Sequence, residues 1–244
     1  MFNLRDAASA IDRRRQEKDG PLALLLVLLT AVTGVVDAVS FLKLGNVFVA
    51  NMTGNVVFGG FAIAGVAAFW TPASFVAIAA FLAGAVTGGG LNLLIGRHRG
   101  RHLAIATVIE IVLVAAAVVV AMRSLNPNDG MPRYALIVLL ALAMGIQNTT
   151  ALHLRVSNLT TTVLTLTLTG LAADAIFASG RQSQTGRKLV AVGAMFLGAA
   201  LGAILISRSG DGAALALALA LLVFVCIGAH RHWSSSAYWT EEAK

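Results

Sequence analysis

The feature that most constrains this chain is a series of apolar stretches long enough to cross a lipid bilayer. A membrane-spanning α-helix needs about 20 consecutive, mostly apolar residues. Stretches of about this length, with few charged side chains inside them, cover residues 21–42, 73–95, 103–121, 134–152, 189–206 and 213–229. The sequence therefore predicts an all-α integral membrane protein.

The composition indicates that lipid covers most of the folded chain. Only 12% of the residues are charged, against about 25% in a soluble domain whose surface must be hydrated. The net charge of +7 is concentrated in the N-terminal tail and the short loops, and such charge keeps loops on the cytoplasmic side of a bacterial membrane. These features argue against a soluble enzyme and a nucleic-acid-binding domain, and they predict a multi-pass protein of the cytoplasmic (inner) membrane.

The chain divides into two membrane halves between polar tails. We expect a cytoplasmic polar tail over residues 1–20, a first membrane repeat over 21–122 and a second over 134–229. A turn-rich connecting loop over 123–133 joins the halves, and a polar C-terminal tail covers 230–244. Both termini are expected in the cytoplasm.

The two halves match in residues as well as in order. The matching pairs are Gly34–Ala38 with Gly145–Thr149, Asn51–Asn55 with Asn158–Thr162, and Gly84 and Gly88 with Gly198 and Gly202. These pairs lie 111, 107 and 114 residues apart, so a few insertions align them all. The sequence therefore predicts an internal duplication.

Each half also contains a less regular segment, near 46–65 and 158–173, and these two segments decide the topology. If each enters and leaves on one side, the chain crosses six times and the repeat is inverted; if each crosses, eight crossings give a parallel repeat. Six crossings place 14 Lys and Arg residues inside and 4 outside, whereas eight crossings place 12 inside and 6 outside. The positive-inside rule favours six transmembrane helices plus two broken or re-entrant half-helix segments, with eight crossings as the alternative.

Polar side chains gather where the irregular segments turn into helices. Asn51 and Asn158 each follow a β-type tetrapeptide and precede a helical pattern, which predicts that each caps a helix start. In an inverted repeat the two starts would approach each other in mid-membrane, where their N–H groups favour an anion. The expected substrate-binding residues are Asn51, Thr53, Asn55, Asn158, Thr162 and Thr165. The alternative is that these side chains only bond neighbouring helices.

Two acidic residues lie inside apolar stretches, where a charge is costly and indicates function by default. Asp37 matches the neutral Asn148 of the second half and is the candidate for proton coupling, with a structural pair to Lys43 or to the second half as the alternative. Glu110 is equally compatible with packing or a polar bridge. Lys43 and Arg155 precede the two helix starts and are candidate electrostatic guides for an anion, or residues that only snorkel to the interface.

The remaining motifs are weaker. Gly84/Gly88 and Gly198/Gly202 are small-xxx-small pairs that predict close helix packing within the chain or a homodimer through those faces. The five histidines lie in loops or at segment ends and are too dispersed for a metal site. We expect no catalytic residue, cofactor or metal, since phosphate-loop, zinc and dinucleotide motifs are missing from the sequence and the lone Cys226 cannot form a cysteine cluster.

Two stretches, Thr33–Leu42 and Asn46–Asn55, resemble the signature of the YoaK-like family of bacterial multi-span membrane proteins. The resemblance covers residues 22–229 and rests on an Asp-Ala pair followed by Ala-Asn-Met-Thr-Gly-Asn. It implies an inner-membrane protein with a domain of unknown function, and it implies no substrate and no site residues.

The sequence favours a small secondary transporter or channel-like permease for a small anionic or polar solute, with proton coupling through Asp37. The paired irregular segments resemble the broken helices of inverted-repeat transporters. The first alternative is a non-transporting membrane partner or assembly protein. A membrane-embedded enzyme is the weakest alternative, because a conventional catalytic constellation is missing from the sequence.

Overall fold

The structure is a computed structural model that describes residues 21–66, 72–95, 98–124, 130–154, 165, 167–170, 172, 182–231 and 233. Seven helices account for most of these residues: α2 (Leu22–Lys43), α3 (Met52–Ile63), α4 (Ala73–Ile95), α5 (Arg99–Arg123), α6 (Gly130–Leu154), α8 (Gln182–Ser209) and α9 (Asp211–His230). Six of them are long and apolar enough to cross a membrane, and α3, with 12 residues, is not. The predicted all-α multi-span architecture is confirmed.

The helices run further into the loops than the sequence predicts. α4 has the predicted bounds, and its start is fixed by the Pro72 carbonyl, which accepts the Val76 N–H at 3.0 Å. In contrast, the predicted loop before residue 103 is largely helical, because the His98 side chain caps α5 and accepts the Arg101 N–H at 3.1 Å. The predicted connecting loop is also shortened, since α5 extends to Arg123 and α6 begins at Gly130.

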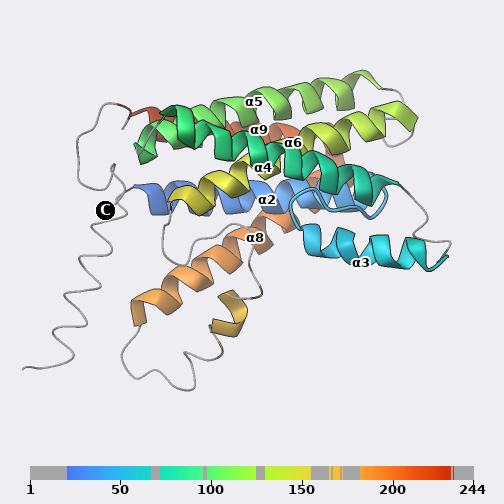
Figure 1. The fold of residues 1–244 in the computed structure, drawn as a ribbon, viewed down its shortest axis with the longest axis horizontal. Helices are drawn as coiled ribbons and strands as arrows, with labels where there is room; N and C mark the ends of the chain where they lie inside the picture. Colours follow the sequence, from blue (N-terminus) through green and yellow to red (C-terminus); the bar gives the residue numbers. More distant parts are fainter. Residues whose placement is uncertain are drawn as a thin grey trace, which may run out of the picture.

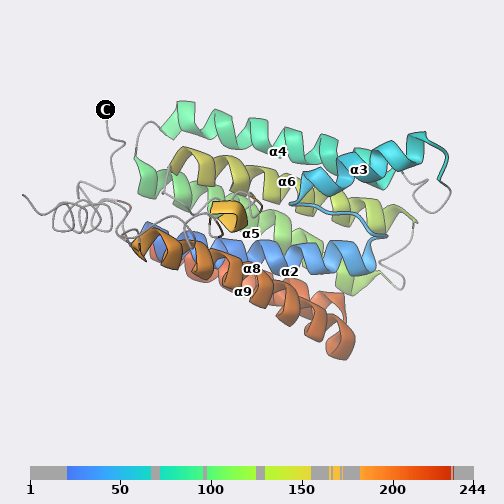
Figure 2. The same cartoon turned by 90° about the horizontal axis from the view of Figure 1, so that it is seen from below.

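The six long helices lie side by side and alternate in direction along the chain (Figures 1 and 2). We call face A the end of the bundle that holds Leu22, Ile95, Arg99, Leu154, Gln182 and His230, and face B the end that holds Lys43, Ala73, Arg123, Gly130 and Asp211. Hydrogen bonds tie helix ends together on each face. On face A the Arg99 guanidinium donates to the Leu154 carbonyl, and on face B Arg133 Nε donates to the Leu44 carbonyl at 2.8 Å.

The helix α3 does not cross the bundle. After α2 ends on face B, residues 44–51 turn back into the protein, and α3 then starts partway along the bundle and runs out to face B (Figure 2). The first irregular segment is therefore re-entrant, as predicted. Its counterpart in the second half lies mostly outside the described residues, although 165, 167–170 and 172 are helical.

Glycines bring two helix pairs into backbone contact. A Cβ atom on Gly84 of α4 would lie 2.2 Å from the Leu142 carbonyl oxygen of α6, and one on Gly198 of α8 would lie 2.2 Å from the Ala31 carbonyl oxygen of α2. These distances are far below van der Waals contact, so only glycine fits. The predicted close packing is confirmed within the chain. Gly84 faces α6 and Gly198 faces α2 of the same chain, and the homodimer through these faces stays a prediction.

The partner helices α6 and α2 carry glycines that make the reciprocal contacts in the same two pairs. A Cβ on Gly145 of α6 would lie 2.1 Å from the Phe81 carbonyl oxygen of α4, and one on Gly34 of α2 would lie 2.3 Å from the Met195 carbonyl oxygen of α8. Gly34 and Gly145 are 111 residues apart, and Phe81 and Met195 are 114 apart. Each of these glycine contacts between α2 and α8 thus has an equivalent between α6 and α4 at the offsets that align the sequence repeat.

Candidate functional site

The turn that leads into α3 is hydrogen-bonded to the carboxylate of Asp37. This side chain is 5% exposed and lies on α2, about two turns before its end. Its Oδ1 accepts the backbone N–H groups of Val49 at 3.2 Å and Ala50 at 3.0 Å, and its Oδ2 accepts the side-chain amide of Asn51. A backbone that is neither helix nor sheet survives inside a membrane only where its polar groups find partners. Asp37 supplies those partners for the deepest part of the turn.

Asn55, in the first turn of α3, bonds to the backbone of Phe48, in the segment that leads into the same turn. Its side chain is fully buried, its Oδ1 accepts the Phe48 N–H at 3.0 Å, and its Nδ2 donates to the Phe48 carbonyl at 2.5 Å. One amide side chain thus replaces the two backbone hydrogen bonds that a neighbouring strand would provide. The Phe48 ring stacks on Phe41 of α2 with centroids 4.9 Å apart, which fixes the turn against that helix.

An arginine in the first turn of α6 closes this turn at face B. Gly45 and Asn46 have φ angles of 84° and 57°, and a Cβ on Gly45 would lie 2.1 Å from the Arg133 guanidinium. The guanidinium therefore occupies the space beside the left-handed turn, while its Nε bonds the Leu44 carbonyl. From the sequence, Arg133 is only a charge in a loop. Its role depends on the approach of α6 to α2, which no local pattern indicates.

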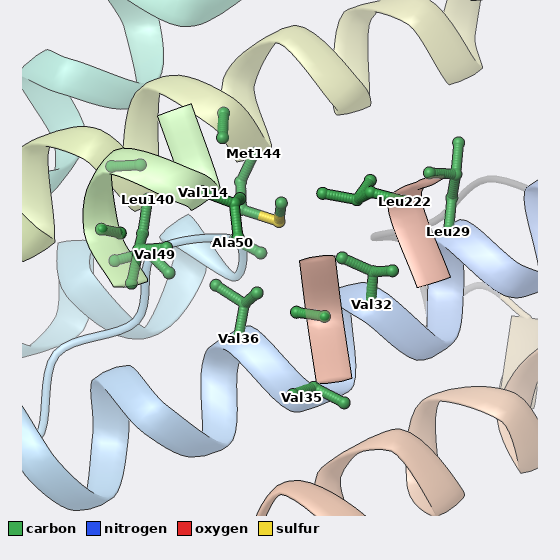
Figure 3. Close-up of a cluster of buried hydrophobic side chains, with 14 of the residues drawn as sticks. Leu29, Val32, Val35, Val36, Val49, Ala50, Val114, Leu140, Met144 and Leu222 are labelled. Carbon is green, nitrogen blue, oxygen red and sulfur yellow. The ribbon is translucent and has the colours of Figure 1, made fainter. Parts of the chain in front are cut away.

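The tip of the turn lies in the apolar core. Val49 and Ala50 are buried beside Val36, Val114, Leu140 and Met144 (Figure 3). These residues come from α2, α5 and α6, so the turn touches helices of both halves. The surroundings of the tip are therefore apolar on one side and bonded to Asp37 on the other.

The prediction for Asn51 is correct in position and wrong in chemistry. The helix α3 begins directly after it, but the Asn51 side chain makes no capping bond; it donates to Asp37 instead. A hydrogen bond to a charged carboxylate is stronger than one from a backbone N–H to a neutral amide oxygen. The donors at the start of the first half-helix are thus already bonded to an internal carboxyl group.

The other predicted site residues separate into three groups. Thr53 is exposed and Lys43 is half-buried near face B. Thr165 is exposed, and its carbonyl accepts the Thr169 hydroxyl at 2.9 Å. Asn158, Thr162 and Arg155 lie outside the described residues, and so does the predicted meeting of the two helix starts.

A second group of buried polar side chains lies nearer face A. Gln147 of α6 is 1% exposed and donates through Nε2 to the Thr33 hydroxyl at 2.8 Å and the Leu29 carbonyl at 3.2 Å, both on α2. His102 is 3% exposed, and its Nε2 lies 3.5 Å from the hydroxyl of the buried Thr150. His102 lies in the first turn of α5, at a segment end as predicted, but it is buried there because α5 starts earlier than predicted.

The two histidines of this region come together although they are far apart in sequence. The rings of His102 and His153 lie 5.7 Å apart between centroids. Within the described part of the chain, groups of three or more His, Cys, Asp or Glu residues that could hold a metal ion are absent. A single histidine pair supplies too few ligands for a tetrahedral metal site.

Comparison with known proteins places this architecture in a family. The chain matches the family model described as "Protein of unknown function (DUF1275)" over residues 25–228. It is also 34% identical over 150 residues to the "UPF0700 transmembrane protein YoaK" of Bacillus subtilis (strain 168); the aligned part is 62% of this chain and 65% of that protein. No solved structure matches. The chain therefore belongs to this family of multi-span membrane proteins of unknown function.

Proposed function

We propose that the protein is a small secondary transporter or channel-like permease for a small polar or anionic solute, with a proton as the coupling ion. The observation that carries the proposal is the re-entrant turn before α3, which places bonded but non-helical backbone inside the bundle at Asp37. Transporters use broken helices of this kind to present backbone groups to a solute near the middle of the membrane. A purely structural bundle has no need for such a turn.

We propose further that the two halves form an inverted repeat, which would suit transport. The equivalent glycine contacts relate α2 to α6 and α4 to α8, and the members of each pair run in opposite directions through the bundle (Figure 2). A two-fold relation of this kind gives two exchangeable arrangements, one open to each side, which is the basis of alternating access.

The bonding of Asp37 bears on the solute. Two of the N–H groups that a bound anion could use before α3 already donate to this carboxylate, and a second negative charge beside it would be repelled. At the first half-helix a neutral polar solute is therefore favoured while Asp37 is ionised, and an anion is favoured when Asp37 is protonated. This couples the charge of the solute to the proton.

Flux measurement tests the proposal. Purified protein is reconstituted into liposomes that contain a pH-sensitive dye, and acetate, lactate, glycine, uracil and glycerol are offered one at a time across a pH gradient. We expect at least one solute to move protons in vesicles with the protein, and we expect Asp37→Asn to abolish the pH dependence because asparagine cannot exchange a proton.

Failure of every solute on the panel, with protein that is shown to be folded, contradicts transport. In that case the alternative, a membrane partner or assembly protein, predicts that the chain is recovered in a stoichiometric complex with another membrane protein. We propose no catalytic activity for the chain.

The orientation is proposed from charge: face A, which holds both ends of the described bundle, lies in the cytoplasm of a bacterial inner membrane, because 14 of the 18 Lys and Arg residues fall on its side in a six-span topology. Single cysteines introduced into a Cys226→Ser background test this. Gly186→Cys near face A should resist a membrane-impermeant maleimide in intact cells, whereas Met131→Cys near face B should react. The reverse pattern would invert the orientation, and labelling of both positions would contradict a single orientation.

A further inference from the structure

A buried carboxyl group lies near the midpoint of a helix long enough to cross the membrane. Glu110 is 0% exposed and sits near the midpoint of α5, between Arg99 and Arg123. At a rise of about 1.5 Å per residue its Cα lies about 16 Å from the start of the helix, which is half the thickness of the hydrocarbon core. Among the described residues neither Oε1 nor Oε2 has a hydrogen-bond partner.

The helices packed against α5 provide no counter-charge at this level. α5 contacts α9, α6 and α4. Their titratable side chains are Asp211, Cys226 and His230 on α9 and Arg133, Tyr134 and His153 on α6, while the α4 sequence contains none. All of them except the half-buried Cys226 lie near helix ends, and the other buried acid, Asp37 of α2, is engaged with the turn before α3. Glu110 is therefore a carboxyl group without a cationic partner in the described part of the chain.

Such a group is stable at this depth only in its neutral form. An ionised carboxylate without a partner loses its hydration and gains nothing in return, so it takes up a proton instead. A metal cation such as sodium would need several oxygen ligands around it, whereas the carboxyl group has no hydrogen-bond partner among the described residues. A proton needs a single oxygen.

The two directions along α5 from Glu110 differ in polarity. Towards face A the buried residues of α5 include Thr107 and His102, and α6 adds Thr150 beside His102 and, one turn deeper, Gln147. The Oε1 atom of Gln147 is also buried without a partner among the described residues. Towards face B the buried residues of α5 are apolar: Val114, Ala117 and Ala121.

We propose that Glu110 is a proton-binding site at the centre of the membrane, and that its proton exchanges with face A along the polar side chains of α5 and α6. In the closed bundle the carboxyl group carries the proton. When the bundle admits water from face A, the proton leaves Glu110 for that water and the carboxylate remains behind. The site deepens the proposed proton coupling, but it is defined by the titration of Glu110 and holds whether or not the chain moves a solute.

Infrared spectroscopy of the protein in lipid bilayers tests the site directly. A protonated carboxyl group gives a C=O stretching band that a carboxylate lacks. We expect this band at neutral pH in the unmodified protein and in Asp37→Asn, and we expect its loss in Glu110→Gln. Protein labelled with ¹³C-glutamate gives the same assignment without a mutation, because the band shifts with the isotope and Glu110 is the one glutamate inside the predicted apolar stretches.

The path is tested by transfer into heavy water, which shifts the band as the proton is replaced by a deuteron. We expect Thr150→Val and His102→Phe each to slow this shift severalfold. The control is Thr87→Val on α4, which removes an exposed hydroxyl that bonds only its own helix at Ala83; it should leave the rate unchanged. Absence of a glutamic acid band at neutral pH would overturn the site, and exchange unaffected by both path variants would overturn the route. Neither result depends on solute flux, so failure here is distinguishable from failure of the transport proposal.

Discussion

Asp37→Ala is expected to lower the free energy of unfolding by about 3–5 kcal/mol, because it leaves two buried backbone donors, at about 1–3 kcal/mol each, and the half-buried Asn51 amide without an acceptor. Two of these donors are the backbone N–H groups of Val49 and Ala50, which cannot reach water. We expect the turn before α3 to lose its position while the six long helices remain in the membrane. Denaturant titration in micelles, followed by circular dichroism, measures the loss.

Asn at position 37 provides the graded comparison. Asp37→Asn keeps one oxygen for the two N–H groups but turns an amide NH₂ towards the NH₂ of Asn51, so we expect a loss of about 1–2 kcal/mol. The double variant Asp37→Asn with Asn51→Asp restores one acceptor and one donor across the pair and should recover most of this loss. If the double variant is as unstable as the sum of the single variants, the bond between these two side chains does not hold the turn.

Alanine at the glycine contacts is expected to have the second large effect. Gly84→Ala or Gly198→Ala places a methyl group about 2 Å from a backbone carbonyl of the neighbouring helix, and the helices can only move apart. Overpacking of this kind costs about 3 kcal/mol. We expect the two substitutions together to leave little folded protein, because they part α4 from α6 and α2 from α8 at once.

Each of these variants has a matched control in its own helix. At Gly90 of α4 and Gly193 of α8 no neighbouring atom lies within 4 Å of the position that a methyl group would take, and alanine is a better helix former than glycine by about 1 kcal/mol. Gly90→Ala and Gly193→Ala should therefore be neutral or slightly stabilising in the same denaturant titration. Equal destabilisation by contact and control positions would contradict the packing described for α4 and α8.

Local signals predicted the helices well and their side-chain partners poorly. The bounds of α4 follow from a proline on one side and a charged loop on the other, and the start of α3 follows from the β-branched residues before Asn51. The partner of Asn51 does not follow, because Asp37 is brought to it by the path of a turn that folds back into the bundle. Periodicity within a helix carries no information on that path.

The same limit applies to Glu110 and Arg133. Both were visible in the sequence, one as an acid within an apolar stretch and the other as a charge in a loop. Whether an acid is paired depends on the faces that α6 and α9 turn towards α5, and the place of Arg133 depends on where the turn after α2 ends. Both depend on contacts between segments that are distant in the chain, and such contacts cannot be predicted from the local pattern of a single sequence.

The pairing of α2 with α8 has a consequence for biosynthesis. α2 is the first of these helices to leave the ribosome, yet the surface that Gly34 fits belongs to a helix that begins at Gln182. The partner of α4, in contrast, is available as soon as α6 is complete. During translation the face of α2 that packs on α8 therefore stays exposed to lipid. The packing of α2 is completed only when α8 and α9 have been inserted. A chain truncated before α8 would retain the contact between α4 and α6. Its α2 would lack its packing partner, and we expect such a chain to be degraded by membrane proteases.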